Sequence, residues 1–210
     1  NCTISVTDSA SNASSTLDVN TFVVDTTAPY INASFGSFMR TPDNNTTPDF
    51  RFSSSEAGTV TFGGSCSSST TSATTGTNTV TFNTLSDGIH ANCTFRVTDS
   101  AGNGSAFFTI YPFIIDTTAP TVAEVTVVST PTNDNTSNYT FSSTEAGTIS
   151  YGGSCSSSTT AATTDNNTIT FNSLPDETYI DCKISVTDNA NNTSDNLSVS
   201  SFTIDTIAPT

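Results

Sequence analysis

The sequence predicts an all-β fold of tandem β-sandwich domains, and three observations support this. A pattern of short motifs recurs about every 90 residues, which is the size of one small domain. Apolar and polar residues alternate with the period of a β-strand, and clusters of Gly, Pro, Asn and Asp separate these runs. No stretch has a helical period. About seven short strands in each repeat indicate an immunoglobulin-like Greek-key sandwich.

Two motifs, each present three times, define the domain organisation. Asp-Thr-Thr-Ala-Pro begins at Asp25 and Asp116 and recurs as Asp-Thr-Ile-Ala-Pro at Asp205, and a Val-Thr-Asp motif precedes each copy at a constant distance. We therefore expect the C-terminal part of a truncated repeat at 1–27, complete repeats at 28–118 and 119–207, and the start of another repeat at 208–210. On this interpretation the chain is an excerpt from a longer array.

Alternating residues locate the strands of each complete repeat. The longest strand should present one inward face in each copy, formed by Ile89, Ala91, Cys93, Phe95 and Val97, and by Ile180, Cys182, Ile184 and Val186. Shorter strands are expected at 49–53, 59–62, 79–82, 138–142, 148–151 and 168–171. The last strand changes parity midway, at Pro112 in the middle copy, which predicts a β-bulge because a bulge adds a residue and tolerates a missing N–H.

The cysteines predict one disulfide in each complete repeat. Cys66 and Cys93 have the same spacing as Cys155 and Cys182. The first cysteine of each pair follows the third strand, and the second lies on the inward face of the sixth strand, which is a neighbour in such a sheet. Two reduced core cysteines are the alternative. Cys2 aligns with the second cysteine of each pair, so its partner is expected outside this chain, and the disulfides predict an extracellular location.

Charge and composition exclude several classes of function. Four Lys and Arg residues against 19 Asp and Glu residues give a net charge of -15, which repels nucleic acid and disfavours anionic membranes. No apolar run approaches the ~20 residues that a membrane-spanning helix needs. His90 is the only histidine, so no Ser/His/Asp set recurs, and a repeated, polar sandwich argues against catalysis by paired carboxylates. We expect a protein that is not an enzyme.

Carboxylates are expected to converge where one repeat meets the next. The turns between the second and third strands and between the sixth and seventh strands lie at the pole where the first strand begins, beside the linker from the preceding repeat. One set comprises Asp25, Glu56, Asp99 and Asn103, and the equivalent set comprises Asp116, Glu145, Asp188 and Asn192. Asp87 and Asp176 face the opposite pole and could contribute from the preceding domain.

Converging carboxylates repel one another unless a cation neutralises them, and these segments contain no Lys or Arg. Ca²⁺ binds six to eight oxygens from carboxylates, amide and backbone carbonyls and water. The sequence therefore predicts a Ca²⁺ site at each junction that locks adjacent domains into a rigid rod. The alternative interpretation is that Asp and Asn are ordinary turn formers and that the acidic surface maintains solubility.

The motif Val-Thr-Asp-Ser-Ala-Gly-Asn at 97–103, closing on Asp-Thr-Thr-Ala-Pro, resembles the tandem bacterial Ig-like repeats of giant surface adhesins. The resemblance covers the whole chain. It implies a secreted, rod-like stalk, often with Ca²⁺ at motif aspartates, which here would be Asp8, Asp25, Asp99, Asp116, Asp188 and Asp205. The sequence departs from this pattern in its cysteine pairs, and Ser11 and Asn191 replace the usual glycine, Gly102.

We therefore expect a structural stalk of a large, secreted or cell-surface repeat protein, whose partners are neighbouring repeats of the same chain. One alternative is a subunit of a filament or surface fibre, with lateral or end-to-end self-association. A second alternative is a module that binds glycans or cells, for which the aromatic candidates are Tyr30, Phe35 and Phe38 with Met39. Numerous Asn-x-Ser/Thr sequons, such as Asn32 and Asn138, also allow glycosylation.

Overall fold

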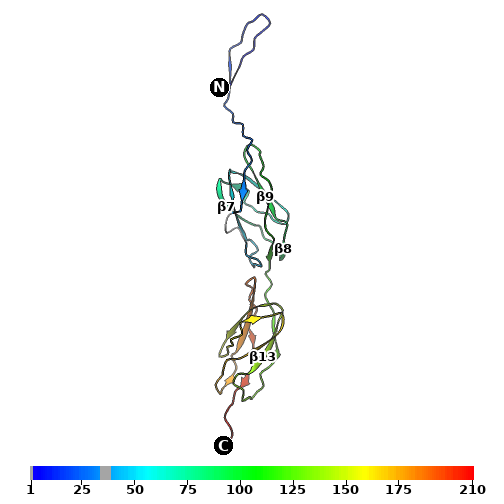
Figure 1. Cartoon of the computed structure of the whole chain (residues 1–210), viewed down its shortest axis with the longest axis vertical. Coiled ribbons are helices and arrows are strands. Elements are labelled where there is room, and N and C mark those ends of the chain that lie inside the picture. The colour runs from blue at the N-terminus through cyan, green and yellow to red at the C-terminus, as the bar shows by residue number, and fades with distance from the viewer. Residues whose placement is uncertain (1, 34–38) are drawn as a thin grey trace.

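The computed structural model describes residues 2–33 and 39–210, which form a short hairpin followed by two β-sandwiches. These parts lie end to end, so the molecule is elongated (Figure 1). The hairpin pairs β1 (Cys2–Ile4) with β2 (Leu17–Val19). The described residues form only strands, turns and irregular segments, so they include no helix that could span a membrane.

The described residues of the first sandwich form nine strands. They are β3 (Ile31–Asn32), β4 (Asp49–Ser54), β5 (Gly58–Gly63), β6 (Ser72–Ala73), β7 (Gly76–Thr81), β8 (Gly88–His90), β9 (Thr94–Thr98), β10 (Phe108–Thr109) and β11 (Phe113–Ile115). One sheet has the order β3-β4-β7 and the other β10-β9-β5-β6, and β11 pairs with β8. These pairs are antiparallel, as expected for the predicted immunoglobulin-like sandwich.

The second sandwich repeats this topology. Its strands are β12 (Val122–Thr126), β13 (Asn138–Ser143), β14 (Gly147–Gly152), β15 (Ala161–Ala162), β16 (Asp165–Thr170), β17 (Thr178–Tyr179), β18 (Lys183–Asp188), β19 (Leu197–Ser198) and β20 (Phe202–Thr203). The sheets have the orders β12-β13-β16 and β15-β14-β18-β19, and β17 pairs with β20. The predicted all-β, immunoglobulin-like fold class is therefore confirmed.

Each sandwich has its own core, in which a disulfide lies between aromatic rings and aliphatic side chains. Cys66 is bonded to Cys93, and Cys155 is bonded to Cys182, as the spacing predicts. In the first core, the rings of Phe52 and Phe95 lie 4.7 Å apart. Alternate residues of the central strands are buried in both cores, because the sheets pack face to face with their apolar sides inward.

The long strand predicted from Ile89 to Val97 is in fact two strands, β8 and β9. The alternation of buried and exposed residues shifts by one position between them. Ile89 and Ala91 are exposed and His90 is buried, whereas Cys93 and the alternate residues of β9 are buried as predicted. Ile180 is likewise 79% exposed, so the inward orientation predicted for Ile89, Ala91 and Ile180 is wrong.

The partner strand explains this change of parity. β10 pairs with β9 and β11 pairs with β8, and Ile110 N donates to Cys93 O at 2.9 Å where both strands are interrupted. The two strands therefore turn over together. The parity change predicted at Pro112 is present, but it is a break in the ladder between β10 and β11.

A polar clasp connects the first strand of the second sandwich with the segment between its last two strands. A carboxylate oxygen of Glu124, on β12, accepts hydrogen bonds from Tyr139 Oη at 3.0 Å and Ser200 N at 2.9 Å. The other carboxylate oxygen accepts a bond from Ser200 Oγ at 2.6 Å. Since β12 and β19 belong to different sheets, the bonds from β12 to the segment directly after β19 hold the two sheets together at this side.

Replacing Glu124 with glutamine should lower the free energy of unfolding by about 1–2 kcal/mol, because one acceptor becomes a donor that faces Ser200 or Tyr139. Burial raises the pKa of Glu124, but hydrogen bonds from Ser200 and Tyr139 outweigh it, so this pKa lies below its usual value. The carboxylate's stabilisation is therefore present above the unfolded pKa and is lost as the pH falls through the folded pKa.

Urea denaturation of the wild type and of Glu124→Gln across acidic and neutral pH checks this prediction. The difference in unfolding free energy should shrink as the pH falls. Glu177→Gln is the control, because Glu177 is an exposed carboxylate of the same sandwich. A difference that stays constant with pH would contradict the proposed role of the charge.

Candidate metal centres at the domain junctions

The structure brings the predicted carboxylates together at two equivalent places. Asp25, Glu56 and Asp99 each offer a carboxylate oxygen, and these oxygens lie within 4.8 Å of one another. At the junction between the sandwiches, Asp116, Glu145 and Asp188 form the same arrangement. Within 2–33 and 39–210, these are the groups of three acidic, histidine or cysteine side chains that are close enough to share a metal ion.

Three different segments supply each group. The second group takes Asp116 from the linker after β11, Glu145 from the turn between β13 and β14, and Asp188 from the end of β18. Ser143 Oγ donates to the backbone carbonyl of Glu145 at 2.6 Å and so fixes that turn. Ser54 and Glu56 form the same bond in the first sandwich. The chain direction of each strand therefore places all three carboxylates at one pole.

A glycine at the start of the third strand allows these segments to approach closely. Gly147 pairs with Asp188 across the ladder, and a Cβ atom on Gly147 would lie 2.2 Å from Thr187 O. Gly58 has the same relation to Thr98 O, at 2.3 Å. The repeated sequence Glu-Ala-Gly is the signal that could have revealed this requirement.

Asn103 and Asn192, predicted as ligands, act as hydrogen-bonding braces in this structure. The Asn192 side-chain amide donates to Asp188 Oδ2 at 2.9 Å and to Asp116 O at 2.8 Å. Asn103 donates in the same way to Asp99 Oδ2 at 2.9 Å and to Asp25 O at 3.1 Å. Each amide therefore ties a turn to the linker from the preceding domain. Their coordination of a cation stays a prediction.

The electrostatics of the groups follow from these contacts. Burial, together with the negative charges of Asp116 and Asp188, raises the pKa of Glu145. In contrast, the hydrogen bond from the Asn103 side chain, aided by backbone N–H donors, lowers the pKa of Asp99 despite burial. The charge of Glu145 is thus opposed by the two other carboxylates of its group. A cation between the three carboxylates would relieve this repulsion.

The other aspartates of the repeated motifs take different roles. Asp8 accepts hydrogen bonds from the backbone and side chain of Asn12, and Asp205 Oδ1 accepts one from Ile207 N at 3.0 Å. Neither belongs to a group of three metal-binding side chains in the described ranges. Asp87 and Asp176 accept hydrogen bonds from the hydroxyls of Thr117 and Thr206. These two aspartates fasten the linker and do not join the carboxylate groups.

The donor set fits Ca²⁺ chemically. It consists of carboxylate oxygens supplied by three segments, and Ca²⁺ prefers oxygen ligands in flexible geometry. The cysteines of the two sandwiches form disulfides within the cores. They therefore offer no thiolate ligand to a transition metal at the junctions. Groups that consist of carboxylates favour a hard cation.

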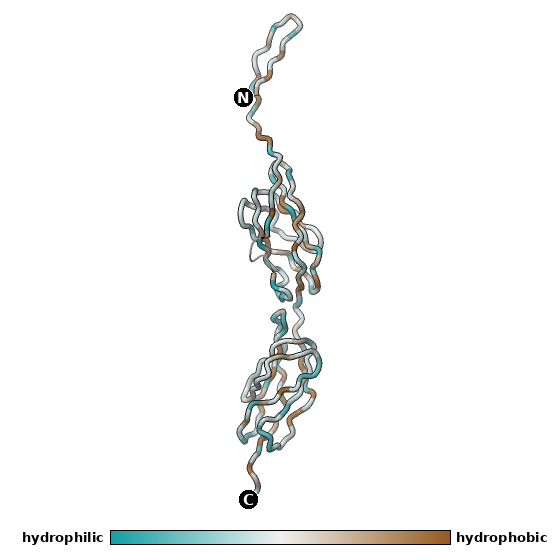
Figure 2. Tube along the Cα trace, viewed as in Figure 1, coloured by the Kyte–Doolittle hydropathy of each residue, from teal (hydrophilic) through white to brown (hydrophobic). Residues whose placement is uncertain are grey.

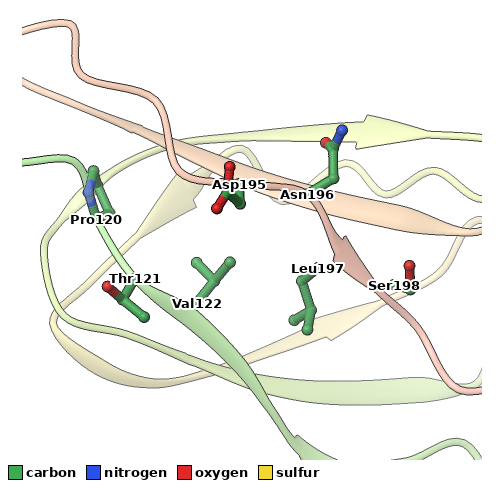
Figure 3. A pocket seen from close by; sticks show the side chains of 7 residues that line it. All are labelled: Pro120, Thr121, Val122, Asp195, Asn196, Leu197 and Ser198. Atoms are coloured by element: carbon green, nitrogen blue, oxygen red, sulfur yellow. The ribbon is translucent and has the colours of Figure 1, made fainter.

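The described residues form neither a cluster of exposed aromatic side chains nor a pocket with a pair of ionisable residues. Tyr30 is exposed, whereas Met39 packs against the first core, and Phe35 and Phe38 lie outside the described residues. Figure 2 shows hydrophobic residues dispersed along the chain. A pocket of about 260 Å³ lies between 120–122 and 195–198, and Figure 3 shows Val122 and Leu197 side by side in it. Asp195 is its one ionisable lining residue, which gives no catalytic pair.

No protein-family model and no curated protein matches the chain. Among solved structures, it is similar to the fibronectin(III)-like modules of Clostridium thermocellum CbhA, at 14% identity and a TM-score of 0.40, covering 84% of this chain and 93% of that one. Similarity to the D00-D0 domain of intimin covers 81% of this chain and 98% of that one, at 13% identity and a TM-score of 0.36.

A further similarity is to SGBP-B of Bacteroides ovatus, solved in complex with a mixed-linkage heptasaccharide. It covers 96% of this chain and 52% of that one, at 13% identity and a TM-score of 0.24. At these values, no ligand or activity of the three proteins is transferred to this chain.

Proposed function

We propose that this chain is part of the stalk of an extracellular, adhesin-like repeat protein, in which it supplies length and stiffness. The observation that carries the proposal is the end-to-end arrangement of the sandwiches (Figure 1), with linker, turns and the two groups of carboxylates gathered at the junctions. The disulfide in each core supports an oxidising, extracellular location. Neighbouring repeats of the same chain are the partners that this function requires.

Ca²⁺ is the proposed cofactor of the junctions. Asp25, Glu56 and Asp99 would hold one ion, and Asp116, Glu145 and Asp188 would hold another. The ion supplies positive charge among carboxylates that otherwise repel one another. The residues of the chain contribute the geometry, because each group joins a linker to two turns of the following sandwich. Asn103 and Asn192 already brace the same segments by hydrogen bonds.

Adding Ca²⁺ should raise the Tm of the chain and narrow the range of lengths in solution, because an ion that binds only the folded state stabilises it. Calorimetry and small-angle X-ray scattering in Ca²⁺ or in chelator measure these two effects. Glu145→Gln with Asp188→Asn should reduce the shift in Tm. The matched control is Glu177→Gln with Asp195→Asn, which removes two carboxylates of the same sandwich outside the group.

Two outcomes would overturn parts of this proposal. If Tm and molecular length were equal in Ca²⁺ and in chelator, the proposal that a cation binds at the junctions would be wrong. Growth of indefinite fibres with protein concentration, seen by electron microscopy, would replace the stalk with the filament alternative.

A further inference from the structure

The turn 188–192 of the second sandwich reaches the end of the first sandwich beside the linker (Figure 1). Ala190, inside this turn, is 1% exposed. Ala101 occupies the same position in the repeat, with only the hairpin and linker before it, and is exposed. The comparison indicates that the preceding sandwich covers the turn, since the two motifs differ only at Ser100, which is Asn189 in the second copy, and at Gly102, which is Asn191.

Arg40 makes most of this contact. Its guanidinium group donates to Asn189 O at 2.7 Å, to Asn191 Oδ1 at 2.9 Å and, more weakly, to Ala190 O at 3.5 Å. Asn44, from the same end of the first sandwich, donates its side-chain amide to Asn191 O at 3.2 Å. The bonds therefore connect residues about 150 positions apart and cross the junction.

The chemistry of arginine suits this turn. A guanidinium group is planar, always charged and has several N–H donors, so it can bind several acceptors on one side of a turn. The left-handed conformation of Asn191, with a φ of 77°, keeps the turn tight between Asp188 and Asn192. Arg40 thus binds the outer side of the turn, whereas Asp188, which belongs to the group of three carboxylates, lies at the start of the turn.

The second sandwich has no equivalent residue. Thr130-Pro131 aligns with Thr41-Pro42, so Ser129 occupies the position of Arg40. A serine side chain is too short and has too few donors to bind a turn in this way. This arginine is therefore a feature of one junction and not of the repeat.

We propose that Arg40 and Asn44 form a docking surface for the turn 188–192 and hold this junction aligned without a metal ion. The inference deepens the proposed stalk function and rests on it only for its purpose, since the contact itself needs no cation. The junction then has two attachments, one through the linker and carboxylates and one through Arg40. Loss of bound cation would weaken the first, which would keep only hydrogen bonds to the linker such as that from Asn192 to Asp116 O, and would leave the second unchanged.

Residual dipolar couplings of the full chain in chelator test this proposal. Two sandwiches that are held rigidly share one alignment tensor, whereas two that move independently have different tensors. We expect one shared tensor for the wild type and different tensors for Arg40→Ser. Arg40→Lys, which keeps the charge but loses the planar group of donors, should fall between them.

Lys183→Ser is the matched control, because it also removes one positive charge, from a residue of β18 that is not at the contact. Unchanged amide chemical shifts inside each sandwich would show that the variants remain folded. A shared tensor for Arg40→Ser in chelator, or different tensors for the wild type, would overturn the proposal. A failure of Ca²⁺ to change the Tm would instead count only against the cation, so the two failures are distinguishable.

Discussion

Replacing both Cys155 and Cys182 with alanine should lower the free energy of unfolding of the second sandwich by about 3–4 kcal/mol. The bond joins residues 27 positions apart, so it restricts a long loop of the unfolded chain. A domain of this size buries a limited core and depends strongly on such a crosslink. Both cysteines are also buried, so the alanines leave unfilled space that adds to the loss.

Urea denaturation followed by amide hydrogen exchange measures this effect separately in each sandwich. Amides of β14 and β18 should lose protection, whereas those of β5 and β9 should keep it, since the Cys66–Cys93 bond remains. Cys2→Ala is the control, because Cys2 is exposed and has no disulfide partner within the described residues. Equal protection of β14 and β18 in the variant and the wild type would contradict the prediction.

The fold could be predicted from the sequence because its signals are local and repeated. Cys93 and Cys182 lie directly before β9 and β18, whose alternate residues are buried, and a repeat of the same spacing identified their partners. The direction of the chain through a Greek key also predicted which turns meet the linker, and so which carboxylates converge.

Periodicity alone could not predict where a strand turns over. Ile89 looks like a core residue and is 71% exposed, whereas His90 looks polar and stacks on Phe113 with ring centroids 5.2 Å apart. Tyr179 replaces His90 in the second sandwich and stacks on Phe202 in the same way. Which of these residues points into the core depends on where the partner strand is interrupted. The sequence of the strand itself carries no signal for this position.

The hydrogen bonds across the junction also could not be predicted from the sequence. Arg40 binds a turn about 150 residues later, and no local motif connects the two segments. Asn103 and Asn192 were correctly placed beside the carboxylates, but their role as hydrogen-bond donors follows from the orientation of the amide. Contacts of this kind depend on the folded arrangement of residues far apart in the sequence.

Replacing Gly147 with alanine should lower the free energy of unfolding by about 2–3 kcal/mol, because the new methyl group would overlap the backbone of the neighbouring strand. Its Cβ would lie 2.2 Å from Thr187 O, a backbone atom held in the β14–β18 ladder. The strands must separate to accept it. Since Gly147 pairs with Asp188 and follows Glu145 by two positions, this separation also moves two carboxylates of the junction apart.

Gly152→Ala is a closely matched control, because Gly152 lies at the other end of the same strand, where a Cβ would meet Lys183 Cβ at an ordinary 3.6 Å. This control should keep wild-type stability and the Ca²⁺-dependent rise in Tm, whereas Gly147→Ala should lose stability and most of that rise. A Gly147→Ala variant that loses stability but keeps the full rise would separate the close approach of the strands from the cation site. Gly147 would then be needed only for the packing of β14 against β18. The carboxylates would still bind the cation when they lie farther apart than the proposed site requires.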